Sequence, residues 1–319
     1  MRPFPHGSLG RMRTPARTLT TAALTAAVAS TLALTPSAAG APACAAPTVT
    51  VISPAKKPLD DWAENLGYDR RGNLWVSRLR AGKVTRVSPG GRVTGSVKVD
   101  DPGAVRLGPD GLLYAASGTT TTNMLPGLPR SGTVVRFDPD AKRPTARVFA
   151  TGFAMPNGMA FGDDRALYVA DSGQGVIRVR PDGQIDRAWT ARAQRAIAPL
   201  LNGFGVNGIA AVDGQLFVTL TTSLTGRVLR LPIHRPASAS VLDLTAPLPG
   251  SLDDLVALPR HRLAVTSVTG QFITVDTRTR QTCTHSAGQP LTALTVTPGS
   301  PHRMIAGTET GDLLSVLLR

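Results

Sequence analysis

Residues 156–179 read PNGMAFGDDRALYVADSGQGVIRV and contain the pattern that decides the fold. An apolar segment ends in a polar turn, and a second segment of the form Leu-aromatic-Val follows at residues 167–169. After a short loop, a third segment has the core Val-Ile-Arg-Val at residues 176–179. Short apolar runs separated by tight turns, with almost no helical periodicity, predict β-strands. Asp110-Gly111 and Asp213-Gly214 are turn dipeptides elsewhere in the chain, and we therefore expect an all-β protein.

The same unit recurs six times along the chain. Its second strand can be read at Leu74-Trp75-Val76, Leu113-Tyr114-Ala115, Leu167-Tyr168-Val169, Leu216-Phe217-Val218, Leu263-Ala264-Val265 and, most weakly, Met304-Ile305-Ala306. Its third strand follows at residues 84–87, 134–137, 176–179, 228–231, 272–275 and 313–316. Six copies between residues 44 and 319 give roughly 46 residues per copy, which is the length of a four-stranded propeller blade. The sequence therefore predicts a six-bladed β-propeller.

The two ends of this repeat array indicate how the ring closes. The sixth copy stops at Arg319 after three strands, and residues 47–52 form a strand-like run that belongs to no copy. We expect this N-terminal strand to complete the last blade, because an open ring would leave sheet edges exposed. Cys44 would then lie near the outer edge of blade six, and Cys283 on the outer strand of blade five. The two cysteines either form one disulfide or remain unpaired.

Residues 1–43 have the features of a secretory signal peptide. Arginines precede an apolar run at residues 19–34, and a small-residue stretch ends at Ala43. The apolar run is short for a membrane span, so we expect no span and a secreted, monomeric domain formed by residues 44–319. Two alternatives remain open: a membrane anchor, and lipid attachment at Cys44, which cleavage after Ala43 would expose.

The charge balance does not indicate a nucleic-acid binder. The net charge is +14, and the signal peptide contributes four arginines and no acidic residue to it. The other basic residues are spread thinly along the chain, and aromatic residues make up only 4% of it. Nucleic-acid binders gather Lys and Arg on one face and add aromatic side chains that stack on bases. We therefore interpret the basic residues as solvated surface side chains and expect no nucleic-acid partner.

One position of the repeat carries oxygen-bearing side chains in four of the six copies. It lies nine or ten residues before the leading residue of each second strand, at the start of each innermost strand. From blade one to blade six, this position holds Glu64, Gly103, Asn157, Asn207, Asp253 and Leu294. The inner strands of a propeller surround its central channel, so residues in equivalent positions converge on the axis. We therefore predict that the four polar side chains meet around one metal ion.

The chemistry of these side chains indicates which metal would bind. Carboxylate and amide oxygens, without His or Cys, suit a hard cation. Ca²⁺ is favoured because ligands from several strands give a loose, high coordination, while Mg²⁺ and Mn²⁺ remain alternatives. Without a cation, Glu64 and Asp253 would repel each other and raise each other's pKa. The alternative interpretation is that the Asn-Gly and Asp-Asp pairs are only turn residues at strand starts.

These four residues resemble the metal-binding set of the calcium-dependent lactonase and phosphotriesterase propellers. That superfamily includes the senescence-marker-protein/gluconolactonases, the paraoxonases and diisopropylfluorophosphatase. Residues 155–161 and 167–172 look especially like the third-blade signature of the gluconolactonases. The resemblance begins at roughly residue 60, extends to the C-terminus, and implies hydrolysis of a small lactone or ester with calcium on the axis. Asn207 stands where gluconolactonases usually have an Asp that serves as ligand and base, so the ligand pattern is nearer to that of the paraoxonases.

The resemblance also suggests roles for two neighbouring carboxylates. The ion would polarise the carbonyl oxygen of the substrate, and Asp253 would act as general base or nucleophile, with Asp254 as the alternative. Residues 119–130, 191–205 and 221–226 are expected to form loops on the same face. These loops either select the substrate or reflect ordinary loop variation. His285 is a further candidate for the mouth of the site.

Two other functions remain open at this stage. One is a non-catalytic extracellular propeller used for binding, with the ion structural or absent, since Gly103 and Leu294 leave two blades without ligands. The other is a lyase or another non-hydrolytic enzyme on the same scaffold. The sequence contains no G-x-S-x-G motif, so a serine-hydrolase triad has little support.

Overall fold

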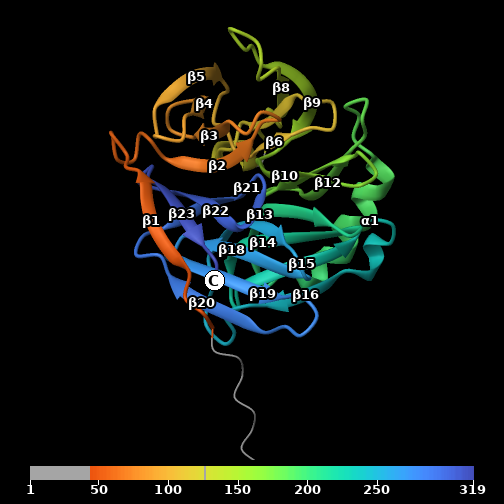
Figure 1. Ribbon diagram of the computed structural model, residues 1–319. Helices are drawn as coiled ribbons and strands as arrows, with labels where there is room; N and C mark the ends of the chain where they lie inside the picture. Colours follow the sequence, from red (N-terminus) through yellow and green to blue (C-terminus); the bar gives the residue numbers. More distant parts are fainter. Residues whose placement is uncertain (1–43, 126) are drawn as a thin grey trace, which may run out of the picture. The chain divides into compact units, whose positions relative to one another are not determined.

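The computed structural model describes residues 44–125 and 127–319, and the predicted signal peptide at residues 1–43 lies outside them. Within the described residues, the strands form six sheets that surround a central axis (Figure 1). Five of these sheets contain four antiparallel strands and one contains three. The prediction of a six-bladed, all-β propeller is therefore confirmed.

Blades one to five take their strands in sequence order from the axis outward, and blade six does so for β21 to β23 and has the N-terminal strand β1 as its outer strand. Blade one contains β2 (Ala63–Tyr68), β3 (Leu74–Arg78), β4 (Lys83–Val87) and β5 (Val93–Lys98). Blade two contains β6 (Val105–Leu107), β7 (Leu113–Ser117), β8 (Gly132–Phe137) and β9 (Arg147–Phe153). Blade three contains β10 (Pro156–Phe161), β11 (Leu167–Asp171) and β12 (Gly175–Val179). Blade four contains β13 (Gly203–Val212), β14 (Gln215–Ser223), β15 (Arg227–Pro232) and β16 (Ser240–Asp243). Blade five contains β17 (Leu252–Leu258), β18 (Arg262–Ser267), β19 (Gln271–Asp276) and β20 (Thr282–Ser286). Blade six contains β21 (Leu291–Thr297), β22 (Ser300–Thr308), β23 (Leu313–Leu317) and β1 (Thr48–Ser53).

The Leu-aromatic-Val strands form the core because they lie inside blades that pack against their neighbours. Trp75 and Tyr168 are completely buried. The ring of Trp75 packs against Phe137 of the next blade, with the ring centroids 5.2 Å apart. Burying a large apolar side chain contributes about 1.5–3 kcal/mol, so these contacts between blades hold the ring together.

A turn aspartate satisfies the polar tip of the buried aromatic residue and explains part of the repeat. Asp164 accepts a hydrogen bond from the hydroxyl group of Tyr168 at 2.8 Å and pairs with Arg178 at 2.9 Å. In blade one, Asp69 accepts a hydrogen bond from Nε1 of Trp75 at 2.9 Å. A buried Tyr or Trp needs such a partner, and therefore the turn and the following strand recur as one unit.

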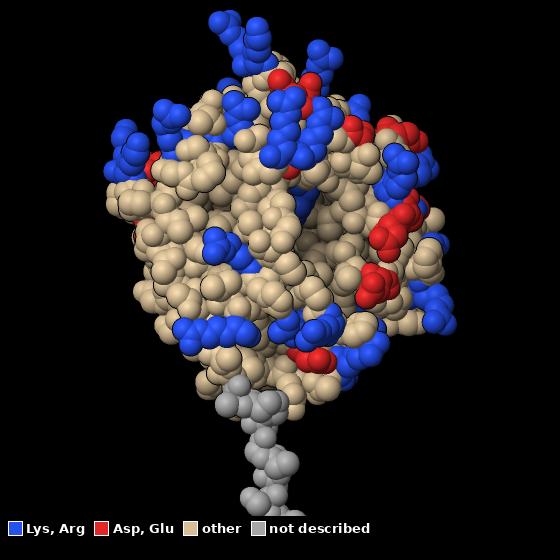
Figure 2. Space-filling model, in the orientation of Figure 1, with Lys and Arg blue, Asp and Glu red and all other residues tan. Residues whose placement is uncertain are grey.

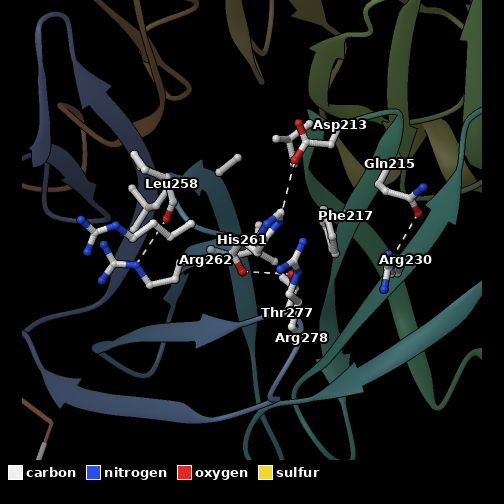
Figure 3. Close-up of a pocket in the computed structure, with 14 residues that line it drawn as sticks. Asp213, Gln215, Phe217, Arg230, Leu258, His261, Arg262, Thr277 and Arg278 are labelled. Carbon is white, nitrogen blue, oxygen red and sulfur yellow. Dashed lines mark hydrogen bonds and ion pairs between the residues drawn. The ribbon is translucent and has the colours of Figure 1, made fainter.

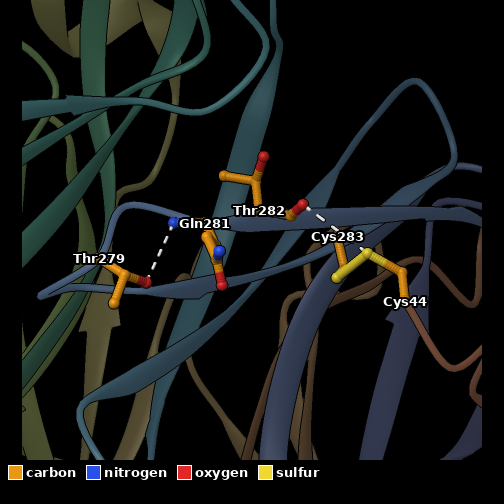
Figure 4. The surroundings of a disulfide bond; sticks show 5 residues. All are labelled: Cys44, Thr279, Gln281, Thr282 and Cys283. Carbon is orange, nitrogen blue, oxygen red and sulfur yellow. Dashed lines mark hydrogen bonds between the residues drawn. A yellow bond between two sulfur atoms is a disulfide. The ribbon is translucent and has the colours of Figure 1, made fainter. Parts of the chain in front are cut away.

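The N-terminal strand closes the ring, as predicted. β1 pairs antiparallel with β23, and Thr48 lies opposite Leu317. Cys44, just before β1, forms a disulfide with Cys283 of β20, and their Cα atoms are 5.5 Å apart (Figure 4). Of the two alternatives for the cysteines, the structure contains the disulfide. It joins the N-terminal segment of blade six to the outer strand of blade five.

Blade three contains a helix that the sequence analysis did not predict. α1 (Arg187–Ile197) packs against β12, where the other blades have a fourth strand (Figure 1). Asp186 caps the helix by accepting a hydrogen bond from the backbone N–H of Trp189 at 2.9 Å. Residues 191–197 are therefore helical and not part of a loop; the helix has a narrow apolar stripe and was hard to recognise. Among the described residues, no helix is long and apolar enough to cross a bilayer.

Two of the predicted loops also differ from expectation. β14 extends to Ser223, which pairs with Gly203 of β13, so residues 221–223 are a strand rather than a loop. The loop at residues 119–130 contains a 3₁₀-helix, η1 (Thr121–Met124). The loops around the ring are thus more ordered than their composition suggested.

Lys and Arg side chains are spread over the surface of the face shown in Figure 2. Many lie around its periphery, others lie nearer the centre or within the central hollow, and they do not gather into one patch. The same face is hollowed near its centre, inside the ring of blades. The dispersal of basic residues expected from the sequence therefore holds on this face.

Candidate metal centre

Each of the four predicted metal-binding residues lies near the start of an inner strand. Glu64, Asn157 and Asp253 are the second residues of β2, β10 and β17, and Asn207 lies within the longer strand β13. In all four strands, the pairing with the next strand shifts register across this residue. A bulge of this kind bends the strand and redirects a side chain. The same local distortion therefore recurs at every predicted ligand position.

The Asn-Gly pairs belong to strands and not to turns. A Cβ atom on Gly158 of β10 would lie 2.2 Å from the backbone oxygen of Asn207. A Cβ atom on Gly208 of β13 would lie 2.6 Å from Cα of Asp254. The inner strands approach each other too closely here for any side chain, which is why glycine follows each Asn. The interpretation of these pairs as turn residues is therefore wrong.

The structure brings the four side chains together on the axis. Asn157 is a hydrogen-bonding neighbour of Glu64, and Asn207 is one of Asp253. Each amide acts to lower the pKa of the carboxyl group beside it. The charge of Glu64 in turn raises the pKa of Asp253, so the two carboxylates also lie near each other. All four side chains are buried, with 5–7% of each residue exposed. We call these four residues the carboxylate layer; that they bind a metal stays a prediction.

Within residues 44–125 and 127–319, no ion pair offsets the negative charges of the carboxylate layer. Burial raises the pKa of Glu64 to about 7, and Nε1 of Trp62, which donates to Oε2 at 2.8 Å, acts in the opposite direction. Burial, followed by the charge of Glu64, raises the pKa of Asp253 well above its usual value. None of the ion pairs formed by the described residues involves either carboxylate. Buried charge of this kind is costly unless a counterion offsets it.

The donor set fits a hard divalent cation. Two carboxylates and two amide side chains offer only oxygen atoms as ligands, which is the set that Ca²⁺ prefers. The described residues contain no group of three or more His, Cys, Asp or Glu side chains that could hold a metal ion. Half of the side-chain ligands would therefore have to be amide oxygens, a mixture that Ca²⁺ accepts and Zn²⁺ does not favour.

A second polar layer lies next to the carboxylate layer and is built around Asp254. The carboxylate of Asp254 accepts hydrogen bonds from Nδ2 of Asn65 at 3.1 Å and from the backbone N–H groups of Leu255 at 2.9 Å and Leu294 at 3.1 Å. A guanidinium nitrogen of Arg106 lies 3.4 Å from it. Burial raises the pKa of Asp254, and Arg106 is the largest influence that lowers it. We call Asn65, Arg106 and Asp254 the arginine layer.

Sequence reasoning missed Arg106. Its guanidinium group donates to the backbone oxygens of Leu66 at 2.8 Å and Val105 at 3.0 Å, and also to Oδ1 of Asn65. It lies on β6, three residues after Gly103, in the one ligand-free blade whose inner strand carries an arginine. An arginine within an inner strand is the signal that could have identified it, because such a residue faces other blades and needs an acidic partner.

The rim of the carboxylate layer comes from blades one and four. Nδ2 of Asn207 donates to Oγ1 of Thr221 at 3.0 Å, so the extended hairpin of blade four orients this amide. Trp62, which donates to Glu64, lies under the guanidinium group of Arg80 at 5.3 Å. The rim thus fixes one amide and one carboxylate before any ligand arrives.

His285 does not lie at the mouth of the site. It belongs to β20, the outer strand of blade five, and lies opposite Phe272. Three strands separate the outer edge of that blade from the axis. The sequence placed His285 by its distance from the sixth inner strand, but the chain is still in blade five at that point.

Comparisons with known proteins identify the fold and no family. No family model and no curated protein matches the sequence. Solved structures do match: a gluconolactonase from Xanthomonas campestris has 17% sequence identity and a TM-score of 0.60, covering 87% of this chain and 96% of that one. Virginiamycin B lyase from Staphylococcus aureus has 12% identity and a TM-score of 0.57, covering 86% of this chain and all of that one. An aldose sugar dehydrogenase from Streptomyces coelicolor has 17% identity and a TM-score of 0.56, covering 85% and 98%.

These likenesses show a shared scaffold. The chain shares its propeller fold with a lactonase, a lyase and a sugar dehydrogenase. Enzymes of different chemistry share this fold, so the activity must be argued from the site.

Proposed function

We propose that the protein is a secreted hydrolase of a small lactone or ester that depends on a hard divalent cation, most suitably Ca²⁺. Glu64, Asn157, Asn207 and Asp253 would hold the ion. The observation that carries this proposal is the pair of buried carboxylates near the axis, each beside an amide and neither in an ion pair with another described residue. A divalent ion would offset both charges at once.

The residues in and around the carboxylate layer would have different roles in this reaction. When bound, the ion would supply Lewis-acid polarisation of the substrate carbonyl. Asp253 would accept the proton of the attacking water, since its carboxylate is buried on the axis and Asn207 holds it in place. Trp62 fixes the carboxylate of Glu64 through a hydrogen bond of 2.8 Å. Asp254 is less suited to the role of base, because its carboxylate already accepts hydrogen bonds from Asn65 and two backbone amides.

The disulfide supports export and argues against a lipid anchor. Disulfides persist in oxidising compartments, which agrees with the predicted signal peptide. The Sγ atom of Cys44 is bonded to Cys283, and a sulfur in that bond cannot also carry a thioether-linked lipid. We therefore favour a secreted protein over one anchored through Cys44. The mass of the exported protein would decide between them.

The proposal is tested by calcium dependence and turnover together. We expect Ca²⁺ to raise the melting temperature of the wild type and to support hydrolysis within a panel of lactones and aryl esters. Asp253→Asn should abolish the calcium shift and lower kcat/KM by about a thousandfold or more, as expected for loss of a ligand and base. Asp182→Asn, at an exposed turn, is the matched control and should leave both unchanged.

Two outcomes would contradict the proposal. Calcium binding without turnover of any lactone or ester would favour the alternative, a binding propeller with a structural ion. Turnover that survives removal of calcium and the Asp253→Asn substitution would place the chemistry elsewhere in the molecule.

A further inference from the structure

A second candidate site lies between blades four and five, at the opposite end of the inner strands from the carboxylate layer (Figure 3). The pocket has a volume of about 550 Å³. It is lined by Val212 and Leu258, the last residues of β13 and β17. Asp253 lies near the start of β17, and five residues of strand separate it from Leu258 by about 17 Å. The pocket is therefore distinct from the metal centre.

This pocket has a strong excess of positive charge. Its lining residues include Arg230, Arg260, Arg262, Arg278 and His261, and the one acidic residue among them is Asp213. Nδ1 of His261 lies 3.9 Å from the carboxylate of Asp213. Among the described residues, none of these four arginines takes part in an ion pair. The guanidinium groups are thus available to an anion from solution.

The turn at the edge of the pocket is unfavourable for the residues that it contains. Arg260 and His261 connect β17 to β18, and both have left-handed backbone conformations, with φ of 62° and 57°. The corresponding turns of blades one, two, four and six include a glycine with positive φ, at Gly72, Gly111, Gly214 and Gly299, and that of blade three has a single left-handed arginine, Arg165, with φ of 62°. Arginine is disfavoured in this conformation, and strained residues of this kind cluster at functional sites. In blade five, the turn places two basic side chains at the pocket instead of glycine.

An uncharged wall completes the pocket. Arg230 lies over the ring of Phe217, 5.9 Å from its centroid, and donates through Nε to Oε1 of Gln215 at 3.2 Å. These contacts hold one guanidinium group in place and leave its two terminal nitrogens without a described partner. Figure 3 shows Phe217 between Arg230 and Arg278 in this view. A ligand here would meet one guanidinium group that is held in place, with other arginines nearby, beside an aromatic and aliphatic surface.

We propose that this pocket binds a phosphate monoester. The terminal phosphate has three acceptor oxygens and close to two negative charges, which matches several guanidinium groups that bind in a bidentate manner. The organic part would lie against Phe217 and Leu258. A carboxylate has one charge and two oxygens, so it would engage fewer of the arginines.

Calorimetric titration with phenyl phosphate tests the proposal. Calcium is removed with a chelator, so that the probe cannot bind through the ion. The wild type should show saturable binding, and Arg230→Ala/Arg278→Ala should weaken it by at least about tenfold, because two charge-assisted contacts are lost. Arg143→Ala/Arg147→Ala removes the same charge from exposed positions of blade two and should bind as the wild type does. Arg230→Lys/Arg278→Lys keeps the charge without the planar fork and should bind with intermediate affinity.

Several results would overturn this proposal. One is that phenyl phosphate shows no saturable binding to the wild type. Another is that the pocket variant and the control variant lose the same amount of affinity for phenyl phosphate. A third is that benzoate binds as tightly as phenyl phosphate. Loss of binding in Asp253→Asn would show that the probe occupies the axis. The outcome is independent of lactone turnover, so either proposal can fail without the other.

Discussion

In the carboxylate layer, Glu64 and Asp253 are buried beside amides and a tryptophan, and no basic residue in the described part of the chain forms an ion pair with them. In the arginine layer, Asp254 is equally buried but lies 3.4 Å from the guanidinium group of Arg106. Asp253 and Asp254 are neighbours in the chain and differ by one position along β17. The protein therefore supplies a cation for one carboxylate and not for the next.

This difference separates a structural charge from a ligand site. A buried carboxylate with an internal arginine is complete without a ligand, and its charge serves the packing of the inner strands. Two buried carboxylates without a counterion leave the folded protein with unfavourable charge that an exogenous cation can relieve. The predictions below test whether the two layers respond to substitution, pH and metal in this way.

The largest expected effect is on the arginine layer. Arg106→Ala should lower the free energy of unfolding by about 3–5 kcal/mol at neutral pH, because it leaves the charge of Asp254 buried and unpaired. Chemical denaturation measures this, with Arg147→Ala on the surface as the control, expected to change stability by less than about 0.5 kcal/mol.

A second variant distinguishes loss of the charge pair from loss of packing around Arg106. Arg106→Ala combined with Asp254→Asn removes both charges and should recover part of the lost stability. If the single and double variants are equally unstable, Arg106 contributes by its contacts with Leu66 and Val105, and the proposed balance of charge in this layer is wrong.

Most of the fold could be predicted from the sequence because the repeat is local. A second strand of related apolar pattern recurs in each blade. In blades one to three the aspartate of the preceding turn accepts a hydrogen bond from its aromatic residue, as Asp164 does from Tyr168. The closing strand β1 followed from a simple count of strands. That count placed Cys44 and Cys283 on neighbouring blades but left their pairing open, and the structure shows the disulfide. α1 escaped detection because it replaces a strand in one blade only, where no repeat could reveal it.

The candidate site was predictable where a position repeats and not where a contact is unique. Counting from each second strand reached Glu64, Asn157 and their equivalents, since the spacing from this position to the second strand is nearly constant and the four ligand-bearing inner strands share one distortion there. Arg106 occupies a position that is basic in blade two alone, and its partner Asp254 lies 148 residues away in the sequence. Such a pairing forms only when the ring closes, and it produces no repeated pattern in the sequence.

The pH dependence of the calcium-free protein should reveal the carboxylate layer. Glu64 has a pKa of about 7 when folded and about 4.5 in a model peptide, and the pKa values of Asp253 and, in the arginine layer, Asp254 are raised in the same direction by burial. The folded state therefore holds more protons than the unfolded state between about pH 4.5 and 7, and stability falls as pH rises through this window. A shift of this size corresponds to about 3 kcal/mol for Glu64.

Denaturation at pH 5 and pH 8 in the presence of a chelator measures this fall. Saturating Ca²⁺ should reduce or reverse it, because the metal binds the deprotonated carboxylates. Groups with lowered pKa, such as Asp69 and Asp164, act in the opposite direction but below about pH 4. Stability that is flat or rises over this range without calcium would show that the two carboxylates are not held as described.

The smallest of these effects, and the one most specific to the comparison, is expected for Glu64→Gln. The amide keeps the size of the side chain and an oxygen that can accept from Nε1 of Trp62, but removes one buried charge. At pH 8 without calcium, we expect this variant to be more stable than the wild type by about 1–3 kcal/mol, and to lose most of the calcium-dependent rise in melting temperature. Glu309→Gln removes an equal charge from a partly exposed neighbour and should keep the calcium response. A Glu64→Gln protein that is less stable than the wild type without calcium, yet responds fully to it, would mean that the cation enters the molecule somewhere other than the axis.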